Sequence, residues 1–319
     1  MERLNMKKLA VFIICSFVMM ISIGLAVYYA GLSDLVKQVV FGAAMFTPLV
    51  AVIITQLLFK EPLFKGLGIS FKLNYWWLIG LLLIPVISFL VMGMSLLVPG
   101  SYLSMDQVME ANQAVLTSQG ISPEQAHDLT QRSLGILGMW GLIATMVVNG
   151  LLAGATINAV LAFGEEIAWR GFLVKVLQGK KFILAAILIG LVWGAWHFPL
   201  VLNGHNYPTH PVIGVFMMIL MCISFTPILL YFRLKSGSVI VPAIMHGTFN
   251  AMIPNFTLLV MPPNDLLIGG MGLAGIIAYL LISVLIFLYD RYISKENLFM
   301  KPMEPQTRVP EVPPVVDRN

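Results

Sequence analysis

Polar side chains with catalytic potential occur in three places along a chain that is otherwise strongly apolar. In each place two of them stand four residues apart, so that in a helix they share one face. The pairs are Glu166 with Arg170, Trp193 with His197, and His246 with Asn250, and Glu165 directly precedes the first pair. Carboxylates, imidazoles and carboxamides are groups that activate water, hold metal ions and stabilise developing negative charge. Such chemistry requires that the helices carrying these three pairs bring their side chains together in the folded protein.

The composition places these residues inside a membrane protein. Of the 319 residues, 59% are hydrophobic and 11% are charged, whereas soluble domains carry about 25% charged residues. A charged side chain at membrane depth is costly and is retained where it is paired or takes part in chemistry. The net charge of +4 comes from basic residues scattered over the loops, and we expect no nucleic-acid partner.

Eight apolar segments are each long enough to cross a bilayer as a helix, which takes about 20 residues. We expect an all-α membrane protein with about eight transmembrane helices, in which the bundle encloses a polar chamber. The expected spans are residues 9–29, 39–59, 75–98, 136–162 and beyond, 182–202, 212–232, 239–260 and 268–289.

Lys and Arg residues occur in every second connection between these spans. Lys175, Lys180 and Lys181, for example, lie between the fourth and fifth spans, whereas loop 203–211 has no charged residue. This alternation predicts that both termini are cytoplasmic. The pattern is typical of a multi-pass integral protein of a bacterial plasma membrane.

The longest polar connection, residues 100–133, is expected on the outer side. Within it Ser122, Pro123 and Gln125 have the pattern of a helix start, with Ser as the cap and Pro at the first position. This pattern predicts a short amphipathic helix that lies on the membrane surface.

The fourth span is longer than one straight crossing needs, because the helical pattern continues from Ile136 to Lys175. Asn149-Gly150 and Gly154 offer places for a break. Either the span bends or tilts there, or its first turns lie outside the membrane.

The chain divides into four parts on this interpretation. Residues 1–135 hold three accessory spans and the outer loop, and residues 136–260 form the core that carries the polar side chains. Residues 261–294 contain the last span. Residues 295–319 are rich in Pro, Glu and Val, and we expect them to form a disordered cytoplasmic tail.

The two adjacent carboxylates are expected to have different roles. In a helix Glu166 lies beside Arg170, with the acid N-terminal to the base, which is the favourable order. Glu165 lies about 100° away around the helix axis. We expect Glu166 to pair with Arg170 and Glu165 to remain free as a general base. The alternative is that the three side chains form a wet, structural end of the fourth span.

His197, His246 and Asn250 each have a structural explanation when taken alone, since polar side chains in apolar helices often form hydrogen bonds between helices. Their depths favour a shared site. At 1.5 Å per residue from the nearest cytoplasmic basic residue, Glu165 lies about 15 Å deep, His246 about 16 Å and His197 about 24 Å. One cavity explains these depths better than three separate polar sites.

A carboxylate and two imidazoles form a donor set of the kind that holds catalytic zinc. Glu165, His197 and His246 could therefore bind Zn²⁺ or another divalent metal. Without a metal, Glu165 could activate water, His197 could position it, and His246 with Asn250 could donate hydrogen bonds to a developing oxyanion. The sequence contains no His-Glu-x-x-His run, and both possibilities stay open.

The motifs Glu-Glu-x-x-x-Arg, aromatic-x-x-x-His and His-x-x-x-Asn, in this order and near apolar spans, resemble those of the CPBP family of intramembrane proteases. This family includes CAAX prenyl endopeptidases and bacterial Abi-type proteins. The resemblance covers about Ile136 to Val260, and Trp193 stands where the family often has Phe. It implies an eight-helix membrane fold with a chamber open to the cytosol and to lipid.

The resemblance also implies a reaction, the hydrolysis of a peptide bond. Glu165 would activate water, and the other site residues would support it, namely Glu166, Arg170, His197, His246 and Asn250. The expected partners are a peptide or lipidated-protein substrate and membrane lipid. A catalytically silent membrane scaffold or bacteriocin-immunity-type protein of the same fold is the main alternative. A small-solute transporter, with Glu165 and the histidines as a proton path, is a third.

Overall fold

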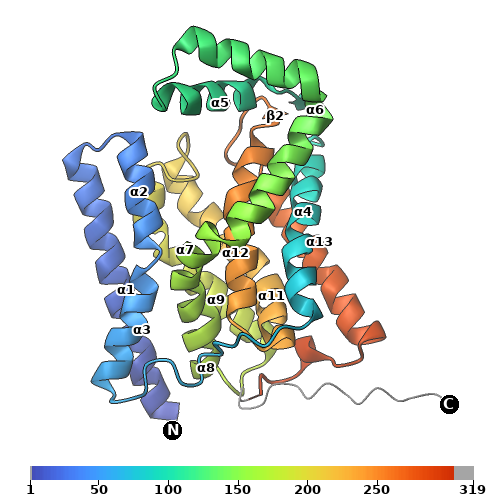
Figure 1. Ribbon diagram of the computed structural model, residues 1–319. Helices are drawn as coiled ribbons and strands as arrows, with labels where there is room; N and C mark the ends of the chain where they lie inside the picture. Colours follow the sequence, from blue (N-terminus) through green and yellow to red (C-terminus); the bar gives the residue numbers. More distant parts are fainter. Residues whose placement is uncertain (1, 305–319) are drawn as a thin grey trace, which may run out of the picture.

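A computed structural model describes residues 2–304 and shows a bundle of long helices (Figure 1). Residues 1 and 305–319 lie outside the described part. Seven segments within it are long and apolar enough to cross a membrane, which confirms an all-α, multi-pass membrane protein. These segments are Asn5–Ala30, Leu35–Leu58, Tyr75–Ser95, Pro123–Ala155, Phe182–Leu202, Pro211–Ser236 and Leu273–Ile293.

The elements follow one another along the chain as helices, with two short strands between them. In order they are α1 (Glu2–Ala30), α2 (Asp34–Ala44), α3 (Thr47–Leu58), α4 (Tyr75–Ser95), β1 (Tyr102–Leu103), α5 (Asp106–Ser118), α6 (Pro123–Ala155), α7 (Ile157–Glu166), the π-helix η1 (Ile167–Phe172), α8 (Leu173–Val176), α9 (Phe182–Trp196), α10 (Phe198–Leu202), α11 (Pro211–Ser236), α12 (Ile240–Thr257), β2 (Val260–Met261), α13 (Leu273–Leu288), the π-helix η2 (Tyr289–Ile293) and the 3₁₀-helix η3 (Leu298–Met300).

Helix α12 lies at the centre of the bundle, in contact with α4, α6, α7 and α11 (Figure 1). It corresponds to the expected span 239–260, but it is not among the seven apolar segments. Neighbouring helices surround it, so its polar side chains, such as His246 and Asn250, need not face lipid. Helix α12 can therefore lie inside the bundle because other helices bury it, even though its own sequence is less apolar than that of the seven segments.

The fourth expected span is broken at Thr156, two residues after Gly154, which was one of the two places suggested, and not at Asn149-Gly150. Thr156 has φ −117° and ψ −99°, and it separates α6 from α7. The junction packs tightly on α12, because a Cβ on Gly247 would lie 2.5 Å from the backbone nitrogen of Ala159. Contact with another helix thus accompanies the break.

Helix α5 and the first turns of α6 form a cap at one end of the bundle (Figure 1). The side chain of Ser122 accepts a hydrogen bond from the backbone N–H of Gln125 at 3.3 Å, which confirms the predicted helix start. Gly138, with φ 64° and ψ 175°, kinks α6. Strands β1 and β2 pair in antiparallel fashion, with Tyr102 opposite Met261, and connect the cap to the end of α12. We call this end the α5 end.

Basic residues gather at the opposite end of the bundle. Lys8 and Lys175 both donate to the carboxylate of Glu61, Lys175 at 3.1 Å. The hydrogen bond from Lys8 lowers the pKa of Glu61 against the effect of burial. The ionised carboxylate thus joins α1 to α8 at neutral pH. We call this end, defined by Lys8, Glu61 and Lys175, the lysine end.

Residues 295–304 differ from the expected disordered tail. The ring of Phe299 is buried and lies 4.4 Å from that of Phe182, centre to centre. Lys181 and Pro302 form an antiparallel β-bridge. Apolar burial and backbone hydrogen bonds hold this segment in place, and the rest of the expected tail, residues 305–319, lies outside the described part.

Replacing Gly247 by Ala tests the contact between α12 and the α6–α7 junction. The added methyl group would meet backbone atoms of Asn158 and Ala159, so we expect a loss of about 1–3 kcal/mol in the free energy of unfolding. The measurement is the melting temperature of the purified protein in detergent. Gly93→Ala in α4 is the matched control, because a Cβ there meets nothing within 4 Å. Equal melting temperatures for both variants would contradict this packing.

Candidate active site

The two carboxylates lie where α7 turns into a π-helix. Helix α7 ends at Glu166, and η1 follows as Ile167–Phe172. Single π-turns inside helices are frequent at functional sites. All six residues of η1 are buried, as are Glu165 and Glu166. This burial excludes the alternative of a wet helix end.

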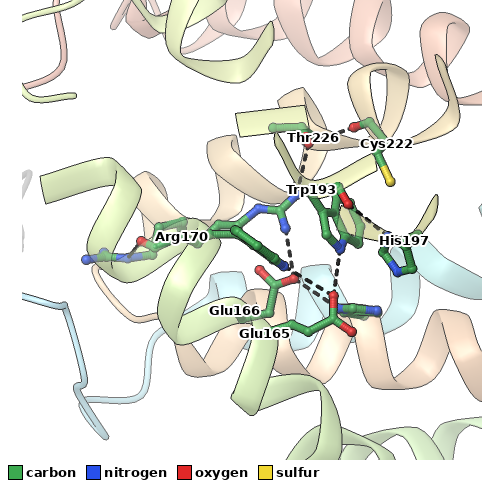
Figure 2. Close-up of polar contacts among 10 residues, drawn as sticks. Glu165, Glu166, Arg170, Trp193, His197, Cys222 and Thr226 are labelled. Carbon is green, nitrogen blue, oxygen red and sulfur yellow. Dashed lines mark hydrogen bonds and ion pairs between the residues drawn. The ribbon is translucent and has the colours of Figure 1, made fainter. Parts of the chain in front are cut away.

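Two side chains donate hydrogen bonds to Glu166, and one of them, Arg170, carries the opposite charge (Figure 2). Its Oε1 accepts hydrogen bonds from Arg170 Nη1 at 2.9 Å and from His246 Nδ1 at 3.0 Å. Arg170 Nη2 donates in turn to Thr226 Oγ1 of α11 at 3.1 Å. The side chains of Glu166 and Arg170 have 0% exposure. They form a fully buried ion pair, as their spacing predicted.

Glu165 is not free, which corrects the expectation from the sequence. Its Oε2 accepts hydrogen bonds from the indole Nε1 of Trp193 at 2.6 Å and of Trp169 at 3.2 Å (Figure 2). Its Oε1 makes no hydrogen bond to the described residues, and the residue is 2% exposed. Two neutral donors therefore orient this carboxylate and leave one oxygen able to accept a proton.

Trp193 of α9 joins the three polar places that the sequence contains. Its ring centre lies 4.5 Å from the guanidinium carbon of Arg170 and 5.3 Å from the ring centre of His246. Its carbonyl oxygen accepts a hydrogen bond from Nδ1 of His197 at 2.8 Å. Together with its bond to Glu165, these contacts place one indole against residues of α7, η1, α9 and α12.

The same hydrogen bonds define the hydrogen positions on both imidazoles. A carbonyl and an ionised carboxylate only accept, so Nδ1 of His197 and Nδ1 of His246 carry the hydrogens. In each ring Nε2 makes no hydrogen bond to the described residues. Both histidines are buried, and their Nε2 atoms are available to water or to a substrate.

Asn250 lies outside this tight cluster. It follows His246 by one turn of α12, is partly exposed, and makes no side-chain hydrogen bond to the described residues. The structure thus brings five of the six predicted residues together around Trp193 and leaves the sixth at the edge of the group. The five are Glu165, Glu166, Arg170, His197 and His246.

Trp169 and Thr226 also belong to the site, although the sequence analysis did not identify them. Trp169 stands four residues after Glu165, the same spacing that marks the other pairs, so this signal was present. Thr226 gives no such signal, since its hydroxyl also bonds the carbonyl of Cys222 one turn earlier, at 2.6 Å. Any threonine in an apolar helix can make that bond.

The expected metal ligands do not converge. Within residues 2–304, no group of three His, Cys, Asp or Glu side chains could hold a metal ion. In the trio Glu165, His197 and His246, hydrogen bonds hold one carboxylate oxygen and Nδ1 of each imidazole, and they leave Glu165 Oε1 and both Nε2 atoms as donors that a metal ion could use. A site for Zn²⁺ or another divalent metal at these residues stays a prediction from the sequence.

Replacing Arg170 by Met tests the buried ion pair. Removing one partner leaves an uncompensated buried carboxylate, so we expect a loss of about 3–5 kcal/mol in the free energy of unfolding. Adding Glu166→Gln should recover part of that loss, because the charge then disappears. The measurement is thermal unfolding in detergent.

Arg132→Met is the matched control for this experiment. Arg132 pairs with Asp128 at 2.8 Å with the same four-residue spacing, but their side chains are 71% and 55% exposed. Loss of this exposed pair should lower the free energy of unfolding by less than about 1 kcal/mol. We attribute the loss of stability in Arg170→Met to the unpaired charge of Glu166. This would be contradicted if the double variant Arg170→Met/Glu166→Gln were no more stable than Arg170→Met alone.

Two comparisons with known proteins agree with this geometry. Residues 140–252 match the family model described as type II CAAX prenyl endopeptidase Rce1-like. A segment of 44 residues is 41% identical to the CAAX prenyl protease 2 of Methanococcus maripaludis, and it covers 14% of this chain and 16% of that protein. The matched range 140–252 contains all six predicted site residues. Residues 140–252 are therefore similar to the Rce1-like family, which the order of the motifs indicated.

Proposed function

We propose that this protein is an intramembrane endopeptidase that hydrolyses a peptide bond in a membrane-associated or lipidated peptide. The observation that carries the proposal is the carboxylate of Glu165, which two indoles orient beside two imidazoles inside an apolar bundle. The family description of residues 140–252 supports proteolysis. The name of the matched relative, a CAAX prenyl protease, supports a lipid-bearing peptide as the substrate class.

The first step is the activation of water by Glu165. Its Oε1 takes one proton from the water molecule, while Nε2 of His197 accepts a hydrogen bond from the other hydrogen and positions the oxygen. The water oxygen bonds to the carbonyl carbon of the peptide. The electrons of the carbonyl double bond move to its oxygen, which gives a tetrahedral oxyanion.

The second step needs hydrogen-bond donors for that oxyanion. Asn250 can donate from Nδ2, and an imidazolium form of His246, with its Nδ1–H bonded to Glu166, would also donate from Nε2. The tetrahedral intermediate then collapses and the carbon–nitrogen bond breaks. The leaving amine takes the proton that Glu165 had received, which restores the carboxylate.

Glu166 and Arg170 support these steps without contacting the reacting atoms. Their ion pair fixes His246 and holds the guanidinium against the ring of Trp193. No step is assigned to a metal ion, because the donor atoms would first have to rearrange to bind one.

The proposed orientation places both termini and the lysine end in the cytoplasm of a bacterial cell. Lys8 and Lys175 meet at Glu61 at that end, and basic residues near spans favour the cytoplasmic side. The α5 end then faces outward.

A catalytically silent scaffold or immunity-type protein of the same fold is the second candidate. The buried pair of Glu166 and Arg170 would serve a scaffold equally well. The two indoles that orient Glu165 favour the enzyme, because a scaffold gains no evident advantage from a buried carboxylate with one unbonded oxygen.

Glu165→Gln tests the proposed base directly. The amide keeps the shape and can still accept from the indoles, but it cannot take a proton, so we expect kcat to fall by at least about 100-fold. Purified protein in lipid nanodiscs would be assayed with a fluorogenic peptide library, with and without a prenyl group. Glu124→Gln, an exposed acid in α6, is the matched control. Wild-type cleavage by Glu165→Gln would refute the proposal, and a chelator arm tests metal dependence separately.

Trp193→Phe tests the orientation of Glu165. The phenyl ring keeps much of the packing against Arg170 and His246 but removes the N–H that donates to Glu165 at 2.6 Å. We expect kcat to fall by about tenfold, the equivalent of one hydrogen bond of about 1.4 kcal/mol, with KM nearly unchanged. Trp140→Phe, 64% exposed, is the control. A change in KM alone would contradict a positioning role for the indole.

A further inference from the structure

A second polar feature lies beside the candidate active site, towards the α5 end. It is a pocket of about 360 Å³ between α5, α6, the start of α7 and α12. Four asparagines and a threonine contribute the polar part of its lining, and no described residue that lines it is charged. The five are Asn112, Thr145, Asn149, Asn158 and Asn255.

The position of Asn149 and Thr145 on α6 is the first reason to assign a function to this pocket. Both residues are exposed side chains within a segment that is long and apolar enough to cross a membrane. A carboxamide that faces lipid without a partner is costly. Asn149 makes no side-chain hydrogen bond to the described residues, so its amide is available to whatever occupies the pocket.

The second reason is the chemistry of the lining. A carboxamide donates and accepts hydrogen bonds in the same way as a peptide group. An anionic lipid headgroup would call for Lys or Arg, and an acyl chain would call for an apolar surface without unsatisfied amides. The lining therefore matches the backbone and uncharged side chains of a peptide.

The third reason is the distance from the reacting groups. Asn158 lies seven residues before Glu165 on the same face of α7, or about 10 Å along the helix. Its Nδ2 donates to the carbonyl of Gly247 at 3.4 Å, directly after His246. On α12, Ala251 of the lining directly follows Asn250. An extended peptide spans that distance with about three residues, at about 3.4 Å each.

The opposite side of the site is closely packed. All residues from Ile167 to Val174 are buried, and a Cβ on Gly171 would lie 3.0 Å from the carbonyl oxygen of Leu67. The connection between α3 and α4, which contains Leu67, runs across the lysine end below α7 and α8 (Figure 1). This packing differs from the chamber open to the cytosol that the family resemblance implied.

We propose that the asparagine-lined pocket binds an uncharged, extended segment of the peptide substrate, about three residues from the bond that is cleaved. This inference rests on the proposed endopeptidase function. Its test must therefore distinguish a wrong pocket assignment from a wrong endopeptidase function.

Asn112→Asp is the informative variant. Asn112 belongs to α5, outside the spanning segments, so a charge there does not oppose insertion into the membrane. Three fluorescein-labelled decapeptides of alanine and glutamine, with Gln, Lys or Glu at one central position, are the probes. Dissociation constants would be measured by anisotropy in the Glu165→Gln background in nanodiscs, and kcat/KM would be measured with Glu165 intact.

The wild-type lining should favour the Gln peptide over both charged peptides. Asn112→Asp should tighten binding of the Lys peptide by about tenfold and weaken that of the Glu peptide by a similar factor, because the charge now faces the bound segment. Asn149→Leu should weaken binding of all three. Gln119→Glu, at the end of α5 and outside the lining, should leave the order unchanged.

The two measurements separate the two proposals. An unchanged order of binding in Asn112→Asp, together with unchanged affinities for all three peptides in Asn149→Leu, would overturn the pocket assignment, whether or not the peptides are cleaved. Binding that follows the expected order without any cleavage would count against the endopeptidase and retain the pocket. If Asn149→Leu alters only the phospholipid that copurifies with the protein, the pocket holds lipid and the proposal is wrong.

Discussion

Burying Glu166 with Arg170 in an apolar bundle removes two charges from water, and their attraction offsets this cost only when their other polar atoms are also satisfied. His246 from α12 and Thr226 from α11 supply hydrogen bonds to the pair. Helices α7, α11 and α12 must therefore bring Glu166, Thr226 and His246 to the same depth in the bundle. This requirement determines how the three helices pack at the centre of the molecule. Within the described residues, Glu166 Oε2 and Arg170 Nε remain without hydrogen-bond partners, so part of the cost of burying the pair is not offset.

The two neighbouring carboxylates differ because their partners differ. Glu166 faces the guanidinium of Arg170, which is an opposite charge. Glu165 faces the N–H groups of Trp169 and Trp193, which orient it without a full opposite charge. A carboxylate locked in an ion pair is a poor proton acceptor, whereas one held by neutral donors can accept and return a proton. In the proposed mechanism, these adjacent residues thereby serve as an anchor and a base.

The sequence predicted those features that depend on local spacing. The apolar periodicity located the membrane segments, and the four-residue spacing predicted the pairing of Glu166 with Arg170. Features that depend on remote contacts were missed. The break at Thr156 accompanies close packing against Gly247 of another helix, and residues 295–304 are ordered by contacts with the start of α9. The role of Trp193 as a donor to Glu165 required the placement of α9 beside α7, which spacing within one helix cannot provide.

The absence of charge in the pocket lining follows from the electrostatics of the neighbouring site. In a medium with an effective dielectric constant of about 20, a unit charge 10 Å away shifts the energy of an ionised group by about 2 kcal/mol. A lysine or glutamate at the position of Asn158 would thus add an electrostatic interaction of this size with the charged groups of the site. Carboxamides provide hydrogen-bonding capacity without that disturbance. In the proposed function, a peptide-binding surface this close to the base is therefore best built from asparagine and threonine, and the same constraint favours uncharged residues in the proposed substrate segment.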